Sequence, residues 1–404
     1  MKKILFLVCL SVSLLNGFSQ DATTTLAGAK TPTKNEGTKN EIVTPQKATV
    51  VSDNDFVIEK VNPVTTVKNQ AQSNTCWAFS TTSLLESQAI KNNIGVMDIS
   101  EMFIVRNMYI EKAKNYVLRQ GHAQFGEGGL GHDVIRAINL YGAVPENVYT
   151  GFRKPEQKLP DHTMLAEGLK KDLDSVILWE MSGKKTDWLP GFISNLDNRL
   201  GFPQSNFVYS GVNYTPKSFS KDVLKFNAAD YVNITSFTHH PFYEPFILEV
   251  PDNFSNGSYY NLPLNEMIDV VKNAVRNGYT VLWDADVSNR GFRQNKGLAL
   301  LVSDSMQLKA DFTAGTKEST WNQDIRQQLF ENLTTQDDHL MHIVGIEKSK
   351  DGKTFFVVKN SWGDVGPYKG FIQVSEAYFA INTISLVVPK AAIAKPVLDR
   401  IGVQ

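Results

Sequence analysis

The stretch from residue 67 to residue 90, VKNQAQSNTCWAFSTTSLLESQAI, constrains the fold and the chemistry of this chain more than any other. It places Cys76 at the start of a run that is compatible with a helix up to Ile90, with Gln70 six positions before the thiol and Trp77 directly after it. The N-terminus of a helix carries partial positive charge and free N–H groups, which favour thiolate over thiol. Two interpretations follow: a nucleophilic cysteine, or a buried and inert one, which is the commoner state of a free cysteine.

The first twenty residues predict an export signal, and this bears on the reactivity of Cys76. Lys2 and Lys3 precede a mostly apolar run, residues 4–15, and a small or polar stretch follows it. The run is too short to span a bilayer, so residues 1–20 are predicted to be a removable signal peptide and the protein to be periplasmic or secreted. The only other cysteine, Cys9, lies in that run. An unpaired cysteine in an exported protein indicates a reactive thiol or an intermolecular bridge.

Composition excludes several classes of partner. The 404 residues carry a net charge of −1 and a pI near 6.7, so the sequence predicts neither a nucleic acid nor an anionic membrane as a partner. After the signal, no stretch approaches the roughly 18 apolar residues of a membrane-spanning helix, so no integral membrane segment is predicted. Residues 21–52 are rich in Thr, Lys, Asn, Pro and Gly, which predicts a disordered leader.

The remaining sequence predicts helices first and strands afterwards. Ser100 is a good N-cap for a helix that continues to Arg119. Residues 154–200 are mixed, charged and helical in pattern, and residues 203–260 indicate loops with short strands. Further helices are predicted at 133–141 and 264–277, and strands at 279–285, 341–347, 354–359, 370–374 and 384–388. This order is typical of an α+β fold with two subdomains.

A nucleophilic thiol needs a base and usually a group that orients the base. Of the seven histidines, His339 and His342 stand out because a predicted hairpin, residues 339–346 and 355–360, brings Asn360 back beside them. The two histidines are three positions apart, so on a strand they point to opposite faces. His342 is embedded among apolar residues, whereas His339 lies at the entry of the strand. We therefore choose His339 as the base.

A glycine cluster, FGEGGLGHD at residues 125–133, has few side chains to cover its backbone N–H and C=O groups. No strand precedes it and no GK[ST] follows, so it is not a phosphate-binding loop. Bare backbone at Gly128 and Gly129 can pair with an extended peptide. The histidines lack ligand spacing with cysteines or carboxylates, so no metal site is predicted.

Three motifs together resemble the papain-like cysteine peptidases: NQ-x5-CWAFS at residues 69–80, DH-x5-G at 338–345 and KNSWG-x6-G at 359–370, in the order of that family. The resemblance implies a papain-like α+β fold with a helical left subdomain, an antiparallel β-barrel-like right subdomain and an active-site cleft between them. It implies the following roles: Cys76 as nucleophile, His339 as general base and acid, Asn360 orienting the imidazole, Gln70 as an oxyanion donor, Trp362 shielding the His–Asn pair, and Gly128, Gly129 and Trp77 binding substrate.

Two departures from the papain pattern narrow the resemblance. Papain-type enzymes have a second cysteine three positions before the nucleophile, where this chain has Ser73. The separation of Cys76 and His339 is 339 − 76 = 263 residues, against about 130–150 in papain and the cathepsins. Both departures, with segments such as GGLGHDVIRAINLYGAVPENVY and YKGFIQVSEAYF, resemble the bleomycin hydrolase/aminopeptidase C branch. The resemblance divides the chain into a peptidase domain at 53–390, with a largely helical insertion at about 150–260, and a C-terminal arm at 391–404.

That branch implies action without a cofactor, often as a hexamer, with the C-terminal carboxylate lying in the cleft and limiting cleavage to the substrate's N-terminus. Three readings stay open. The first is an exported cysteine aminopeptidase that acts on peptides. The second is an endopeptidase of the same fold with an open cleft. The third is a catalytically silent binding protein of that fold.

Overall fold

The computed structural model describes residues 41–43, 56–154, 156–303 and 313–404, which belong to one compact unit, residues 39–404. The predicted signal peptide and nearly all of the predicted leader lie outside the described residues. Within the leader, Ile42–Val43 form a short strand, β1, that pairs antiparallel with β3 (Val64–Thr65), so this part of the segment is ordered rather than disordered as predicted. No helix among the described residues is both long and apolar enough to cross a membrane.

The first half of the chain is helical, as its patterns predict. The helix of the cysteine begins at Cys76 itself, and Ser100 caps the next helix by accepting a hydrogen bond from the N–H of Phe103 at 3.1 Å. The third helix ends at Gly142, whose φ of 81° lies in a region that favours glycine. The α-helices of the described residues are α1 (Cys76–Lys91), α2 (Glu101–Leu118), α3 (Gly131–Tyr141), α4 (Leu165–Met181), α5 (Leu189–Leu200), α6 (Pro216–Ser218), α7 (Leu264–Arg276), α9 (Gln323–Glu331), α10 (Glu376–Asn382) and α11 (Lys395–Arg400).

The second half builds an 11-stranded sheet within the described part of the chain. Its strands are β2 (Phe56–Val61), β6 (Tyr231–Thr235), β7 (Pro245–Ile247), β8 (Ser258–Asn261), β9 (Val281–Ala285), β10 (Phe292–Arg293), β11 (Leu298–Ala299), β12 (His339–Ser349), β13 (Thr354–Lys359), β14 (Phe371–Ser375) and β15 (Thr383–Pro389). The order is β10-β11-β14-β13-β12-β9-β15-β6-β8-β7, with β2 on β12. The order shows no closing pair among the described residues, so the sheet is open rather than a closed barrel.

The predicted hairpin is confirmed. Strands β12 and β13 pair antiparallel, with His342 opposite Lys359, so the residue after β13, Asn360, returns to the end of β12 where His339 begins the strand. The remaining short elements are the strands β4 (Phe207–Tyr209) and β5 (Val212–Tyr214), the π-helix η1 (Phe219–Val223), and the 3-10 helices η2 (Ala228–Asp230), η3 (Gln294–Lys296) and η4 (Lys390–Ala392).

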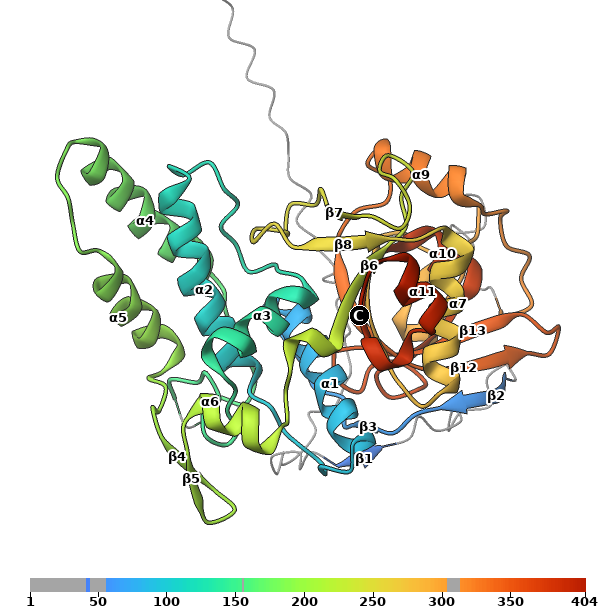
Figure 1. The fold of residues 1–404 in the computed structure, drawn as a ribbon, viewed down its shortest axis with the longest axis horizontal. Coiled ribbons are helices and arrows are strands. Elements are labelled where there is room, and N and C mark those ends of the chain that lie inside the picture. Colours follow the sequence, from blue (N-terminus) through green and yellow to red (C-terminus); the bar gives the residue numbers. More distant parts are fainter. Residues whose placement is uncertain (1–40, 44–55, 155, 304–312) are drawn as a thin grey trace, which may run out of the picture. The chain divides into compact units, whose positions relative to one another are not determined.

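Helix α1 lies between the two halves. Figure 1 shows α2, α4 and α5 on one side of α1 and strands β12 and β13 on the other, and α1 packs directly on β12. Two large cores follow: one joins Trp77 and Leu84 to the helices, and the other joins Trp283 and Phe379 to the sheet and α7. The α+β class with two subdomains is therefore confirmed.

The predicted insertion at about 150–260 is helical only in its first part, where α4 and α5 pack on each other and on α2. Its second part supplies β6 and β8, which pair with each other in parallel, and β7 beyond them. Because β6 also pairs antiparallel with β15, this part of the insertion extends the main sheet.

Candidate active site

Cys76 is the first residue of α1, where the helix leaves N–H groups free. A tight loop holds it there. The hydroxyl of Ser73 donates to the carbonyl of Gln70 at 2.7 Å and lies 2.6 Å from the hydroxyl of Thr75. Ser73, at the position of the missing second cysteine, therefore fixes the approach to the helix by hydrogen bonds. Cys76 is only 9% exposed, so the loop presents a largely buried thiol.

Gln70 is held against the strand hairpin. Its N–H donates to the carbonyl of Ser361 at 2.8 Å, and its Oε1 accepts a hydrogen bond from the Ser361 hydroxyl at 2.6 Å. Because the amide oxygen is engaged, the Nε2 end is left to donate. A fixed side-chain N–H is the kind of donor that an oxyanion site requires.

His339 and Asn360 form the hydrogen bond that the hairpin predicts, with 2.8 Å between His339 Nε2 and Asn360 Oδ1. The orientation of the Asn360 amide is fixed, because Oδ1 also accepts from the N–H of Ser361 at 2.7 Å and Nδ2 donates to Gln294 Oε1 at 3.0 Å. His339 Nε2 must therefore carry the proton, which leaves Nδ1 as the basic nitrogen. The ring of Trp362 stacks on His339 at 4.7 Å between centroids.

His342 lies against α1 instead of beside Asn360. It is fully buried, and its Nδ1 is 2.9 Å from the hydroxyl of Ser83. Burial lowers the pKa of His342 well below its ordinary value. Of the two candidate histidines, the structure thus brings His339 together with Asn360 and keeps His342 against α1.

Burial dominates the electrostatics of the thiol and the imidazole. It raises the pKa of Cys76 to about 12, a shift to which the charges of Asp337, Asp252 and Asp284 add and which a hydrogen bond from the Leu340 backbone opposes. That bond places the sulfur beside the residue that follows His339. Burial also lowers the pKa of His339 to about 4, and the bond to Asn360 opposes this shift.

Each group by itself is therefore neutral at pH 7. A thiolate forms when the proton passes to the imidazole, because the two opposite charges then stabilise each other in a medium of low dielectric constant.

The glycine loop, residues 125–131, is held in place by hydrogen bonds from the side chains of Lys112 and Trp77. The buried Nζ of Lys112 donates to the carbonyls of Gly126, at 2.9 Å, and of Gly128. Trp77 donates from Nε1 to the carbonyl of Glu127 at 2.9 Å, and its ring would lie 3.0 Å from a Cβ placed on Gly129. Trp77 is 1% exposed, so it supports the loop from beneath instead of facing a substrate.

Comparison with known proteins identifies the family of this chain. The family described as "Peptidase C1-like family" matches residues 202–403, half of the chain, and "Papain family cysteine protease" matches residues 52–150. The chain belongs to the peptidase C1-like family. It is thus a cysteine-type peptidase on a papain-like fold.

Individual relatives cover most of the chain at low identity. Aminopeptidase C of Streptococcus thermophilus is 25% identical over 385 residues, covering 84% of this chain and 83% of that protein. Aminopeptidase W of Lactobacillus delbrueckii subsp. lactis is 24% identical over 390 residues, covering 82% and 83%. The crystal structure of PepW from a Lactobacillus rhamnosis strain superposes with a TM-score of 0.66 at 20% identity, covering 86% of this chain and 84% of that one, which shows a shared fold.

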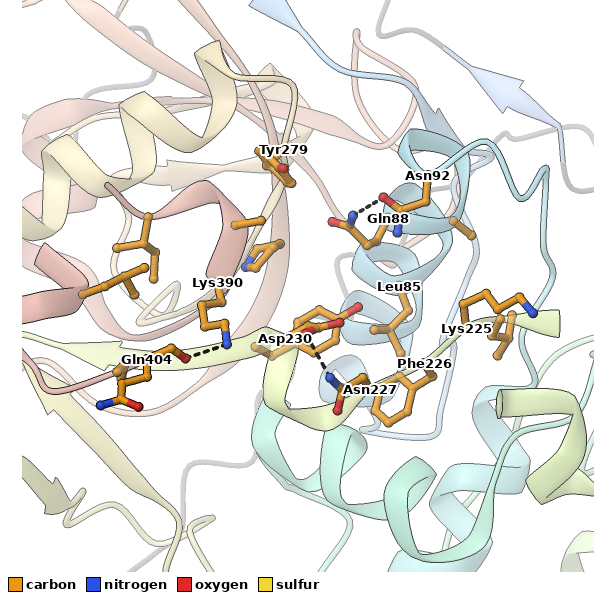
Figure 2. A pocket seen from close by; sticks show the side chains of 18 of the residues that line it. Leu85, Gln88, Asn92, Lys225, Phe226, Asn227, Asp230, Tyr279, Lys390 and Gln404 are labelled. Carbon is orange, nitrogen blue, oxygen red and sulfur yellow. Dashed lines mark hydrogen bonds between the residues drawn. The ribbon is translucent and has the colours of Figure 1, made fainter. Parts of the chain in front are cut away.

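Residues 390–404 of this peptidase lie away from Cys76. Lys390 Nζ donates to the carbonyl of Gln404 at 2.9 Å, and both residues line a pocket of about 840 Å³. Figure 2 shows them across the pocket from Leu85 and Gln88, in the far half of α1, and from Asn92, the residue that caps its end. Leu85 is nine residues beyond Cys76, a separation of roughly 13 Å along a helix axis. Residues 390–404 therefore lie near the far end of α1, an arrangement that differs from the one the resemblance implies.

A second group of histidines lies in a hydrogen-bonded cluster. His240 Nε2 is 2.7 Å and His239 Nε2 3.2 Å from the carboxylate of Glu249. Gln327 fixes the tautomer of His239, because its Oε1 accepts from the N–H of Thr238 and its Nε2 therefore donates to His239 Nδ1. His239 Nε2 must then carry a proton, which disfavours a metal ion at that atom.

Three residues near the site had no signal in the sequence: Gln294, Lys112 and Asp252. Each reaches the site from a distant segment and belongs to no motif. Gln294 lies 66 positions before the Asn360 that it contacts, so only the fold reveals the pair.

Proposed function

We propose that this peptidase is an exported cysteine aminopeptidase that hydrolyses peptides through Cys76, His339 and Asn360. The observation that carries the proposal is the bond from His339 Nε2 to Asn360 Oδ1. It leaves Nδ1 as the basic nitrogen of a residue whose neighbour, Leu340, hydrogen-bonds from its backbone to Cys76 at the start of α1. The relatives named aminopeptidase C and aminopeptidase W support the aminopeptidase part.

The residues support the following steps. His339 Nδ1 takes the proton of Cys76, and the sulfur attacks the carbonyl carbon of the scissile amide. The oxyanion accepts hydrogen bonds from Gln70 Nε2 and the N–H of Cys76, each donor contributing about 10²–10³ in rate. The imidazolium then protonates the leaving amine, and a thioester remains on Cys76. Water, deprotonated by His339, hydrolyses the thioester and restores the thiol.

The test is hydrolysis of aminoacyl-coumarin substrates by the purified protein and by Cys76→Ala and His339→Ala. We expect both variants to lose activity, because one lacks the sulfur that attacks the substrate and the other lacks the imidazole that transfers the proton. Titration of the thiol with the epoxide E-64 counts competent sites in parallel. Full activity of Cys76→Ala would end the proposal, and a wild-type protein that E-64 does not label would favour the catalytically silent binding protein.

The position of residues 390–404 favours an endopeptidase as the second candidate, because no part of that segment lies beside Cys76 to limit the substrate. The two candidates differ in their preference for a free α-amino group. An aminopeptidase prefers an aminoacyl-coumarin to its N-acetylated counterpart, whereas an endopeptidase cleaves N-acetylated peptides at internal bonds.

The proposal extends to location and assembly. Removal of residues 1–20 and export to the periplasm or the medium are tested by cell fractionation and N-terminal sequencing of the recovered protein. Assembly into a homo-oligomer, a hexamer by family resemblance, is tested by light scattering on a sizing column. Recovery of the intact N-terminus in the cytoplasmic fraction contradicts export, and a monomer mass contradicts the assembly.

A further inference from the structure

A carboxylate lies on the glycine loop, close to the thiol. A Cβ placed on Gly128 would come 1.9 Å from Oδ2 of Asp252, so the carboxylate of Asp252 covers the α-carbon of this glycine. Gln124 Nε2 holds the other oxygen, Oδ1, at 2.7 Å. The charge of Asp252 also contributes to the raised pKa of Cys76. Asp252 is therefore within electrostatic reach of the reacting sulfur.

The loop that carries Asp252, between β7 and β8, is held firmly. The side chain of the next residue, Asn253, is buried and donates to the carbonyls of Leu248 and Gly257, at 2.9 Å each. Its Oδ1 accepts from the N–H of Gly257 at 2.7 Å. A carboxylate on such a loop keeps one position relative to the glycines, which a specific binding group must do.

Asp252 makes no direct ion pair with a described residue. The charge of Lys112 lowers the pKa of Asp252, but the Lys112 Nζ donates its hydrogen bonds to the carbonyls of Gly126 and Gly128. The side chain is half-buried, and partial burial raises the pKa of Asp252. A half-buried carboxylate that makes no direct ion pair and can still be reached is suited to a cationic ligand.

Backbone beside Asp252 also lacks partners. Gly129 is buried, yet no hydrogen bond within the described residues involves its N–H or its C=O. Buried backbone groups are nearly always satisfied, so a ligand or water must supply these bonds. A peptide that pairs with Gly129 lies next to Gly128 and therefore meets the carboxylate of Asp252.

Two other carboxyl groups, those of Asp284 and Asp337, contribute to the raised pKa of Cys76, and burial raises the pKa of each of them. Asp284 is buried in β9 and accepts a hydrogen bond from the Ser385 hydroxyl at 2.9 Å. Asp252 differs from Asp284 because it is only half-buried and lies over Gly128 of the glycine loop.

We propose that Asp252 binds the α-ammonium group of the substrate's N-terminal residue, and so selects peptides with a free N-terminus. The inference rests on the proposed aminopeptidase function and names the group that sets its specificity. A peptide extended beyond that position carries an uncharged amide, which cannot pair with the charge of the half-buried carboxylate. Free-amine substrates are favoured and N-blocked ones are rejected by the same side chain.

The experiment compares kcat/KM for aminoacyl-coumarins, dipeptidyl-coumarins and their N-acetylated counterparts in the wild type and in Asp252→Asn. The substitution keeps the shape and removes the charge. We expect kcat/KM for the preferred free-amine substrate to fall about tenfold to a hundredfold, mainly through KM, since a charged hydrogen bond of about 1.5–3 kcal/mol is lost. The rate on the acetylated substrate should stay level or rise. The preferred length, one residue or two, reports how far from the scissile bond the ammonium sits.

Controls separate this inference from the proposed function. Asp222→Asn, an exposed carboxylate on η1, is the charge-matched control and should leave the free-to-acetylated ratio unchanged. E-64 titration shows whether each variant is folded. If Asp252→Asn does not fold, Gln124→Leu releases the same carboxylate, and an unchanged ratio in that variant also overturns the inference.

The outcomes are distinct. A wild type that prefers free amines, with the same preference in Asp252→Asn, overturns the role of Asp252 and leaves the aminopeptidase proposal intact. A wild type that cleaves acetylated and free substrates equally overturns the aminopeptidase proposal itself.

Discussion

Gln294 is expected to act as a positioning residue for the His339–Asn360 pair. It is 7% exposed, and its Oε1 is the acceptor for Asn360 Nδ2 at 3.0 Å. Its own Nε2 makes only long bonds to the carbonyls of Phe371 and Val365, at 3.3 and 3.4 Å. The bond to Asn360 is therefore the interaction whose loss matters most in Gln294→Leu, a substitution of similar volume.

The magnitude follows from the buried donor that is left behind. Asn360 is 3% exposed, so its Nδ2 would lose its partner without gaining water, at a cost of about 1–3 kcal/mol. The amide would then be free to rotate. His339 is charged while the amine leaves, so its bond to Asn360 Oδ1 is stronger in that state than in the resting enzyme. We expect kcat to fall about tenfold, equivalent to about 1.4 kcal/mol, with KM unchanged.

The assay is steady-state hydrolysis of the best coumarin substrate, beside urea unfolding of the same variant. Gln294→Glu is the matched control, because a carboxylate still accepts from Asn360 Nδ2 and should recover much of kcat. A variant that unfolds more easily yet keeps the wild-type kcat would refute the positioning role and leave Gln294 a purely structural residue.

Three further outcomes follow from the structure. Burial raises the pKa of Glu347 to about 8, above its value in the unfolded chain. The ionisation of this carboxyl therefore lowers the free energy of unfolding as pH rises from about 4.5 to 8. In urea unfolding, Glu347→Gln should have the same free energy of unfolding as the wild type at pH 5 and a value higher by a few kcal/mol at pH 8. Equal stability at both pH values would contradict this. Gly131→Ala places a Cβ 2.0 Å from Leu282 Cδ2, so overpacking should destabilise the protein by about 1–3 kcal/mol, and a wild-type unfolding midpoint would show that the contact relaxes freely. His339→Ala removes the proton acceptor of Cys76, so the rate at which iodoacetamide alkylates the thiol at pH 7 should fall at least about tenfold and should increase with pH. An unchanged rate would mean that His339 does not determine the fraction of thiolate at Cys76.

The sequence predicts those parts of the fold that local pattern determines. The helix from Cys76, the cap at Ser100 and the hairpin that returns Asn360 to His339 each depend on neighbouring residues, and each is confirmed. The choice of His339 over His342 needs the two-residue period of a strand and the apolar neighbours of His342. The structure places the two side chains in different surroundings, as that period requires.

Side chains that reach the site from distant segments could not be predicted. Asp252 reaches Gly128 from the loop before β8, and Lys112 reaches the same loop from the middle of α2. The position of such residues depends on how the insertion folds back on the helices. The way in which the insertion folds back on the helices produces neither a hydrophobic period nor a motif spacing that could be recognised in a single sequence. The strands of the insertion were likewise expected only as short pieces, because their pairing with β15 is a long-range contact.

The charges around Cys76 imply an order of events in catalysis. Burial disfavours both thiolate and imidazolium, and Asp252 raises the pKa of the thiol further, so the resting pair is neutral. An ammonium group on Asp252 would cancel that carboxylate's effect, because a cation and an anion together exert little net field on the sulfur. Binding of a free N-terminus thus lowers the pKa of Cys76 at the moment when a carbonyl is in place to be attacked. An N-blocked peptide leaves the carboxylate uncompensated and the thiol protonated. The same side chain that recognises the substrate would then also couple recognition to formation of the nucleophile, so Asp252→Asn should narrow the difference in kcat between free and blocked substrates as well as the difference in KM.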